Sequence, residues 1–375
     1  MGTIRLLLAI AVVIGHTSSV FGLTSVGGII AVQSFFMISG FYMALILNEK
    51  YKGPGSYKLF ISNRFLKIFP AYWVVIALIV LISVIKYSIN KDPFTLYYYE
   101  FADFLHPLSW IYLVLTNIVI FGQDLVMFME FKPSGMLDLT AWFQFSKPPV
   151  HIFLLVPQAW SLAIELMFYL IAPLFVRRSA KTLTVILLSS LALRFYIYAT
   201  GFPSDPFTYR FFPNELAFFI AGAIAYKQYV RLKEDVLTQR IGQALLLVIG
   251  TVILFYPFIW KTNPDAKQWI FYAVFAFSLP YIFTYSKSIK TDQWIGELSY
   301  PIYISHVFIF HLLGSFNVFQ EKQFTGILSI LCTLLFSMIL VNYVMKPIET
   351  YRQNRVNQLK RGPSKPLRAK GTTVN

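Results

Sequence analysis

Long apolar runs, separated by short segments that are polar and mostly basic, are the main pattern of this 375-residue chain. A helix crosses the roughly 30 Å hydrocarbon core of a bilayer with about 20 apolar residues. Runs of this kind predict ten spans, near residues 4–22, 27–47, 68–89, 152–176, 182–200, 210–228, 241–260, 268–286, 293–314 and 323–346. A further run, 104–121, is shorter and contains a proline and an asparagine. The pattern therefore predicts an all-α fold, a polytopic membrane bundle of about ten transmembrane helices.

The basic residues between the runs predict the orientation of the bundle. If the N-terminus is cytoplasmic and 104–121 does not cross, the inner segments are all rich in Lys and Arg; they are 48–67, 177–181, 227–240, 287–292 and the tail after residue 346. Cytoplasmic loops of membrane proteins carry this excess. A crossing at 104–121 would move Arg177, Arg178 and the basic tail outside. We therefore expect ten spans, both termini in the cytoplasm, and 104–121 as an external interfacial or re-entrant segment.

The composition agrees with a membrane protein and excludes other classes. Hydrophobic residues make up 57% of the chain and charged residues 13%, about half of what a soluble domain carries. The net charge of +15 follows from the cytoplasmic loops, so nucleic-acid binding is not expected. We expect one membrane domain over residues 1–349 and a basic, disordered cytoplasmic tail over 350–375, near anionic lipid. The aromatic outer segment 90–151 fits either an interfacial belt or a sugar-binding lid.

Ionisable groups inside the spans are costly unless they are paired or hydrated, so each is a candidate for function. Arg5 and His16 of the first span are eleven residues apart. This is close to three full turns, so the two residues share one face at about 16 Å along the axis. Arg5 lies at the cytoplasmic mouth, where a simple anchoring role is the alternative. His16 lies toward the outer half, where a helix-packing histidine is the alternative.

Glu165 is the most informative acid of the chain, because it lies in the middle of a span. A carboxylate at that depth must meet a cation, take up a proton or face water. Ser161 and Tyr169, four residues to either side, share its face. A structural pair with an arginine or a histidine is the alternative. His306 lies deep in a later span, one turn after Tyr303.

Two adjacent cations, Arg64 and Lys67, precede the third span at positions i and i+3 and face the same way. Beside the inner lipid headgroups, these two side chains either bind a phosphorylated ligand or anchor the helix at the membrane surface. Together with His16, Glu165 and His306 they indicate a path from a cytosolic anion to an internal acid–base site. The sequence has no Gly-rich phosphate loop, metal-ligand cluster or nucleophile elbow.

Five short motifs extend over nearly the whole chain. They are Arg-x10-His at residues 5–16, Phe-Phe-x-x-Ser-Gly-Phe at 35–41, Arg-x-x-Lys-x-x-Pro at 64–70, Trp-Ser-Leu-x-x-Glu at 160–165 and Ser-Tyr-x-x-Tyr-x-x-His at 299–306. In this order they resemble the acyltransferase-3 family of bacterial membrane acyltransferases, which O-acylate cell-surface carbohydrates. Two positions depart from the family pattern. Leu166 stands where a second acid often follows the glutamate, and Met345 replaces the acid of the closing Val-Glu-Arg/Lys-Pro motif.

The resemblance implies a reaction that uses both sides of a bacterial cytoplasmic (inner) membrane. The donor would be a cytoplasmic acyl-CoA, acetyl-CoA first, and the acceptor a hydroxyl of a polysaccharide such as exopolysaccharide, capsule or O-antigen. His16 would be the general base, Glu165 would orient or charge-stabilise it, and His306 is a further catalytic candidate. The donor ligands would be Arg5, Arg64 and Lys67, with supporting positions at Ser39, Tyr72, Trp160, Ser161 and Tyr303. No metal is expected, and a polysaccharide synthase or export machinery is a candidate partner.

Two other functions fit parts of the pattern. A secondary transporter or flippase of a lipid-linked saccharide would also have ten spans and buried ionisable groups. Transporters of this kind often contain inverted repeats with broken helices, and the hydropathy pattern contains none. A purely structural partner of a polysaccharide synthase would need neither the buried acid nor the histidines. The acetyl content of surface polysaccharide separates the enzyme from both.

Overall fold

Helices dominate the computed structural model of the chain, which describes residues 1–361 apart from 18, 21 and 317–321. The α-helices of this part are α1 (Gly2–His16), α2 (Gly28–Glu49), α3 (Ser56–Asn90), α4 (Pro107–Val119), α5 (Trp160–Phe175), α6 (Ala180–Ala199), α7 (Phe212–Tyr229), α8 (Val236–Phe255), α9 (Pro264–Ser286), α10 (Lys290–Glu297), α11 (Ser299–Ser315), α12 (Lys322–Leu340) and α13 (Lys346–Arg361). Two short strands, β1 (Met129–Phe131) and β2 (Leu137–Leu139), pair antiparallel. The predicted all-α class is confirmed.

Each predicted span falls on a helix. Within the described residues, seven helical stretches are long and apolar enough to cross a membrane, and the spans predicted at α1, α7 and α11 are shorter or more polar. The predicted span 293–314 is divided at Leu298 into α10 and α11, and the predicted span 68–89 is the C-terminal part of α3. The chain is thus a multi-pass helical membrane protein.

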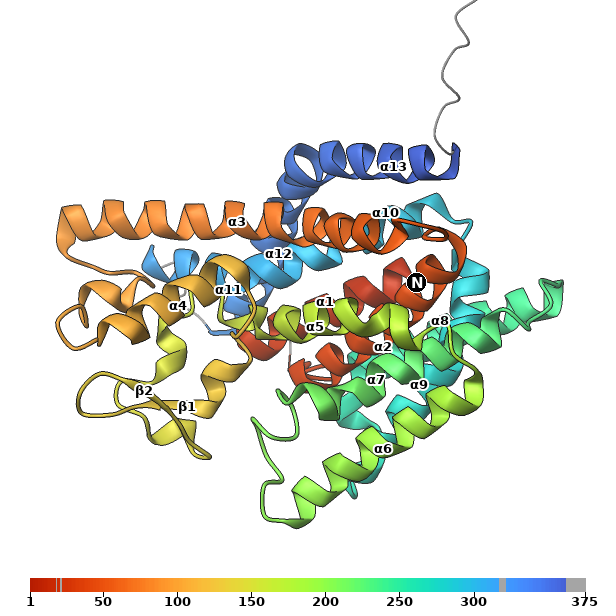
Figure 1. Cartoon of the computed structure of the whole chain (residues 1–375), viewed down its shortest axis with the longest axis horizontal. Helices are drawn as coiled ribbons and strands as arrows, with labels where there is room; N and C mark the ends of the chain where they lie inside the picture. Colours follow the sequence, from red (N-terminus) through yellow and green to blue (C-terminus); the bar gives the residue numbers. More distant parts are fainter. Residues whose placement is uncertain (18, 21, 317–321, 362–375) are drawn as a thin grey trace, which may run out of the picture.

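The bundle has two distinct ends, which we name after the predicted orientation. The inner end carries the α2–α3 connection, residues 50–55, and the outer end carries residues 91–156. In Figure 1, α3 runs between the two ends, with the chain's N-terminus toward the inner end and the β1–β2 hairpin at the outer end. This arrangement places Arg5 of α1 near the inner end and His16 near the outer end.

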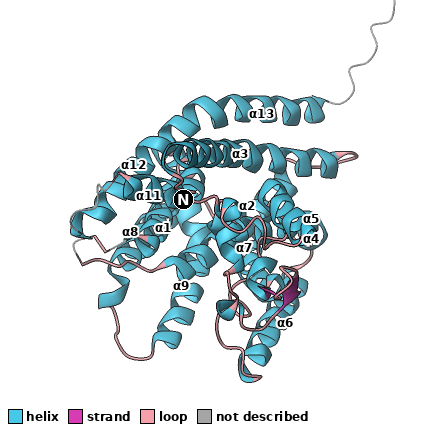
Figure 2. Cartoon of the chain, turned by 90° about the vertical axis from the view of Figure 1, so that its left-hand side faces the viewer, coloured by secondary structure: helices cyan, strands magenta, loops and turns pink. Residues whose placement is uncertain are grey.

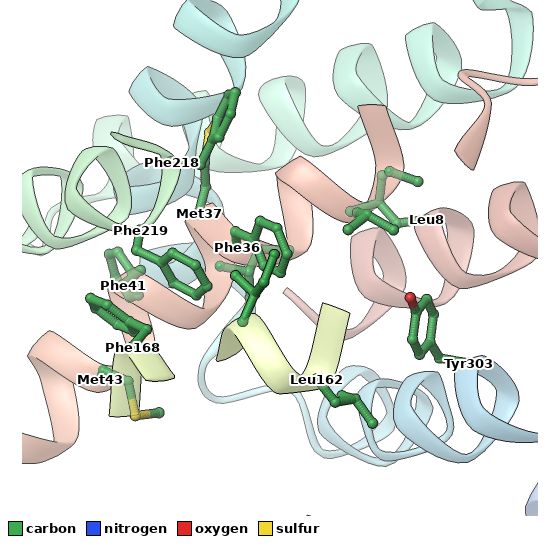
Figure 3. Close-up of a cluster of buried hydrophobic side chains, with 14 of the residues drawn as sticks. Leu8, Phe36, Met37, Phe41, Met43, Leu162, Phe168, Phe218, Phe219 and Tyr303 are labelled. Atoms are coloured by element: carbon green, nitrogen blue, oxygen red, sulfur yellow. The ribbon is translucent and has the colours of Figure 1, made fainter. Parts of the chain in front are cut away.

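The core of the bundle centres on α2, most of whose side chains are buried. Gly40 of α2 lies against the backbone of Phe219, and Gly222 of α7 lies against the backbone of α2, so that a Cβ at either position would overlap the other helix. Small residues permit such close approach between membrane helices. The Phe219 ring stacks on Phe36 and Phe168, with ring centroids 4.6 and 4.2 Å away (Figure 3).

One buried acid belongs to the framework of the bundle. Glu215 of α7 is fully buried, and its Oε1 accepts hydrogen bonds from Arg194 Nη1 of α6 and from Gln33 Nε2 of α2, both at 3.0 Å. A buried charge persists only when it is paired and hydrogen-bonded in this way. The network therefore joins α2, α6 and α7.

The outer segment 91–156 folds into a cap with a small hydrophobic core of its own. The buried residues of this core are Tyr98, Leu105, Leu113, Val126, Phe131, Val150, Phe153 and Leu154. Within the cap, α4 has 13 residues, about 20 Å of helix, which is too short to cross a bilayer. Tyr72 and Trp73 of α3 donate hydrogen bonds to the carbonyls of Asn117 and Ile118 at 2.6 and 2.9 Å and so tie α4 to α3.

The C-terminal segment differs from the prediction. We expected disorder from residue 350, but α13 continues to Arg361 and lies along the inner part of α3 (Figures 1 and 2). Arg355 donates hydrogen bonds to Asn63 Oδ1 and Ser62 Oγ, both at 2.8 Å, and Val356 is buried. Packing of one face on protein stabilises a helix that is otherwise polar, and a hydropathy pattern does not reveal such packing. The rest of the predicted tail, 362–375, lies outside the described residues.

Candidate active site

A cavity of about 530 Å³ lies in the inner half of the bundle, between α1, α2, α3, α5, α11 and α13. Its volume is within the range of small-molecule sites, roughly 300–1,000 Å³. Most of the predicted site residues line it, from five different helices: Arg5, Ser39, Arg64, Lys67, Ser161, Glu165 and Tyr303. The fold therefore brings together side chains that are up to about 300 residues apart in the chain.

Among the cations of this cavity, three form no ion pair within the described part of the chain. Arg5 of α1 and Arg64 and Lys67 of α3 line the cavity, and none of their side chains makes a hydrogen bond or an ion pair with any residue that the structure describes. The Arg64 guanidinium lies 5.8 Å from the ring centroids of Phe60 and Tyr169, which are its aromatic contacts. Partly buried cations without partners favour an anionic ligand, because the ligand offsets their lost hydration.

The carboxylate of Glu165 lies in the same cavity and is held by two hydroxyls. Ser39 Oγ donates to Glu165 Oε1 at 2.5 Å, and the Tyr169 hydroxyl donates to the same oxygen. A carboxylate has two acceptor oxygens, so Oε2 is left for a ligand. The side chain is partly accessible from the cavity. The Glu165 carboxylate is thus held in place by Ser39 and Tyr169 and lies beyond the three cations in the cavity.

The two histidines meet at the outer end of α1. His306 Nε2 lies 3.3 Å from His16 Nδ1, and the ring centroids are 4.9 Å apart. His306 is fully buried, whereas His16 is exposed. Neither residue lines the cavity.

Contacts with backbone carbonyls indicate which ring nitrogens of this histidine pair carry a hydrogen. His306 Nδ1 lies 2.7 Å from the Tyr303 carbonyl and His16 Nδ1 lies 2.9 Å from the Val12 carbonyl. Because a carbonyl only accepts, each Nδ1 carries the hydrogen in the neutral rings. His16 Nδ1–H is then shared between the Val12 carbonyl and His306 Nε2, and His16 Nε2 keeps a free lone pair. This is the arrangement of a proton acceptor held by a second group.

Tyr303 of α11 connects the cavity with the histidine pair. Its hydroxyl lies 2.6 Å from Ser161 Oγ and donates to the Gln158 carbonyl at 2.9 Å. Its ring centroid is 6.0 Å from that of His306. Figure 3 shows the ring extending from α11 toward the interior of the bundle. Tyr303 therefore lines the inner cavity and also lies next to His306 of the outer pair.

Some predicted site residues are apart from this centre. The hydrogen-bond partners of Glu165 are Ser39 and Tyr169, and His16 contacts His306 instead of Glu165. Trp160 lies toward the outer cap, where the Arg210 guanidinium stacks on it at 4.2 Å. Tyr72 is fully buried and serves the contact between α3 and α4.

Other cavity residues were not predicted. Glu349 and Arg352 of α13 line the cavity, as does Asp292 of α10. The Asp292 carboxylate accepts hydrogen bonds from the backbone N–H groups of Gly2 and Thr3 at 2.6 and 2.8 Å, at the start of α1. Burial by itself would raise the pKa of Asp292, but these N–H groups and the terminal ammonium lower it to about 2.

Sequence comparison identifies the family. Residues 2–345 match the model of the acyltransferase-3 family, described as an acyltransferase domain. The chain belongs to this family. The five motifs, the cavity cations, Glu165 and both histidines of this acyltransferase all lie within the matched residues. No solved structure matches the chain significantly.

Relatives of this acyltransferase include one with a described activity. It is 26% identical to the peptidoglycan O-acetyltransferase OatA of Listeria monocytogenes, over 92% of this chain and 54% of that protein. An uncharacterized protein of Aquifex aeolicus is 24% identical over 53% of this chain and 90% of its own length. An uncharacterized protein of Haemophilus influenzae is 32% identical over 46% of this chain and 60% of its own length. The chain thus spans about half the length of the Listeria protein.

Proposed function

We propose that this acyltransferase transfers an acyl group, acetyl first, from a cytoplasmic acyl-CoA to a hydroxyl of a cell-surface or exported polysaccharide. The observation that carries the proposal is the arrangement along α1. An unpaired Arg5 lies near the inner end of this helix, and His16, with a free Nε2, lies at its outer end. A donor that binds near Arg5 and an acceptor that binds near His16 would approach each other along the length of α1.

The donor part of the proposal rests on charge. Coenzyme A carries several phosphate groups, and arginine guanidinium groups bind phosphate oxygens through parallel hydrogen bonds. Two guanidinium groups, of Arg5 and Arg64, and the ammonium of Lys67 line the cavity without an ion pair within the described residues. The cavity continues from them past Glu165 to Tyr303. A slender thioester arm that enters from the inner end would therefore approach the histidine pair.

The chemistry needs one proton acceptor near the thioester. His16 Nε2 takes the proton of the acceptor hydroxyl as its oxygen attacks the thioester carbonyl carbon. The ester bond forms, the carbon–sulfur bond breaks, and the leaving thiolate takes the proton from His16. General-base help of this kind contributes roughly 10²–10⁴ in rate. His306 accepts the Nδ1 hydrogen of His16 and so keeps the lone pair on Nε2.

The acceptor part of the proposal rests on exposure and on one relative. His16 is exposed at the C-terminal end of α1, toward the outer end of the bundle. The name of the Listeria relative describes a peptidoglycan O-acetyltransferase, so a glycan hydroxyl is the expected acceptor class. The proposal includes a bacterial inner membrane, both termini in the cytoplasm, and a polysaccharide synthase or export machinery as partner.

The test measures the acetyl content of surface polysaccharide in cells that carry wild type or His16→Ala at matched expression. We expect His16→Ala to lose at least 99% of the wild-type acetylation, in line with a roughly hundredfold base contribution. His311→Ala is the matched control, because His311 also lies on the outer part of the bundle but does not contact the histidine pair. Unchanged acetylation in His16→Ala would remove this residue from the mechanism.

A second arm separates transfer from transport. Inside-out vesicles receive acetyl-CoA labelled in the acetyl group together with a soluble glycan acceptor in the lumen. The enzyme is expected to place the label covalently on the glycan. Label that stays in the donor while a saccharide crosses the membrane would favour the transporter alternative.

A further inference from the structure

The helix α13 begins at residue 346, just after the family-matched residues 2–345, yet it lies against the cavity. Four of its side chains line the cavity at the spacing of one helix face: Glu349, Arg352, Gln353 and Val356. On a neighbouring face, Arg355 binds Ser62 and Asn63 of α3. The helix is therefore fixed on α3 by one face and presents another to the site.

Arg352 is the cation that this helix contributes. It is 6% exposed, its Nη1 donates to Glu349, and its Nε has no hydrogen-bond partner within the described residues. Arg64 of α3, 7% exposed, has an orphaned Nε in the same cavity. Leaving a buried N–H group unpaired is costly, and more so on a charged group. Two buried guanidinium groups with free donors form a cradle that an anion would satisfy.

The charge balance favours a phosphate group as this anion. Around the cradle, Arg5 and Lys67 add positive charge, and Glu349 is the acid that faces Arg352. Glu349 also accepts from Gln353, and its side chain is 42% exposed. The lining of the whole cavity includes six Lys and Arg side chains and four acids, Glu165, Asp292, Glu297 and Glu349, so an excess of positive charge remains. Arginine forks match the geometry of phosphate oxygens.

We propose that α13 completes the donor site and that Arg352 and Arg64 together hold a phosphate group of the acyl-CoA, an inference that rests on the proposed function. The same chemistry would bind the phosphate of a lipid headgroup. The position of Arg352 inside the cavity, with Glu165 farther in, favours the donor.

The test measures equilibrium binding of coenzyme A to the full chain in nanodiscs of zwitterionic lipid. Arg352→Gln is expected to raise the Kd at least tenfold, as the loss of charge-assisted hydrogen bonds predicts. Arg352→Lys should recover part of this loss, because it keeps the charge without the fork. Glu349→Gln is expected to lower the Kd, since it removes the acid that competes for Arg352.

The controls separate this inference from folding and from the proposed function. Lys346→Gln removes a charge from the same helix at an exposed position outside the cavity, and its Kd should match wild type. Equal melting temperatures show that each variant is folded. An unchanged Kd in Arg352→Gln overturns the inference, as does an effect that appears only when anionic lipid is present, which would assign the cradle to a headgroup. Binding is measured without turnover, so a chain that binds coenzyme A but transfers no acyl group contradicts the proposed function alone.

Discussion

At the scale of single residues, the second histidine determines what the first can do. His306 uses its Nδ1–H on a backbone carbonyl, so the lone pair of its Nε2 faces His16. In a serine protease triad a carboxylate takes this place and its negative charge stabilises the imidazolium. His306 is a neutral acceptor, so the hydrogen bond it provides is worth roughly 1 kcal/mol rather than the larger value of a charged pair. We infer that His306 acts mainly by fixing the orientation and tautomer of His16.

This inference predicts a graded effect of substitution at position 306. His306→Leu removes the acceptor and should lower kcat about tenfold, the equivalent of roughly 1.4 kcal/mol, with the KM for acetyl-CoA unchanged because the donor cations are at the other end of α1. His306→Gln offers an amide oxygen to His16 Nδ1–H and should retain more activity than the leucine variant. Steady-state kinetics with labelled acetyl-CoA measures both constants. Equal activity of wild type and His306→Leu would show that the contact is only packing.

A substitution at Glu165 can test the role of its charge separately from the role of its packing. Both of its protein hydrogen bonds go to Oε1, and the amide oxygen of a glutamine can accept both. Glu165→Gln should therefore keep the melting temperature of wild type, while transfer falls at least tenfold because the negative charge that Glu165 presents to the cavity is lost. Thermal unfolding in detergent and transfer rates are measured on the same sample. Wild-type transfer by this variant would leave Glu165 with the structural role that the sequence also allows.

At the scale of helices, the apolar pattern predicted the helices that a bilayer requires to be apolar along their length. Spans such as α2 and α9 were found from sequence because a membrane-crossing helix must be apolar over its length. The apolar pattern missed the first turns of α3 and the whole of α13. These segments pack on protein and have a polar face, so they do not form long apolar runs. The spacing of Arg5 and His16 placed both on one face of α1, but it did not identify α11 as the partner of that face. Such a contact joins residues 290 positions apart and depends on how the helices pack.

The start of α1 provides a prediction about pH. Asp292 satisfies the N–H groups of Gly2 and Thr3, as an N-cap residue does. Its folded pKa, about 2, is below the roughly 3.9 of an unfolded aspartate, so its contribution is complete above about pH 4 and is lost as the pH falls toward 2. Asp292→Ala should lower the melting temperature by roughly 2–4 °C near neutral pH.

The pH dependence is measured by thermal unfolding in detergent between pH 7 and pH 2.5. The difference between wild type and Asp292→Ala should shrink as the pH falls below about 4, because the unfolded wild-type chain then takes up a proton at Asp292 while the folded chain keeps this carboxylate ionised down to about pH 2. Asp103→Ala, which removes an exposed acid of the outer cap, controls for the general effect of charge. A difference that stays constant across this range would mean that the charge of Asp292 does not support α1.

At the scale of the whole molecule, one gradient of charge connects the predicted topology with the candidate site. Basic segments gather at the inner end, and the cavity with its unpaired cations opens among them. The same positive charge that predicts the orientation of the bundle would, under the proposed function, also attract an anionic donor to that side. The outer end holds the cap and the exposed face of His16 instead. The proposed function requires this predicted orientation, since a reversed bundle would present its cations to the outside.

The orientation is testable with single cysteines. Cys332, the one cysteine of the chain, is replaced by serine, and a new cysteine is placed at Ser134 of the exposed β1–β2 connection or at Lys233 of the exposed α7–α8 connection. An impermeant thiol reagent added to intact cells should label position 134 and should label position 233 only after lysis. The two positions lie on opposite ends of the bundle, so each controls for the reactivity of the other. Labelling of 233 in intact cells, with protection of 134, would invert the bundle and place the cavity on the side that has no acyl-CoA.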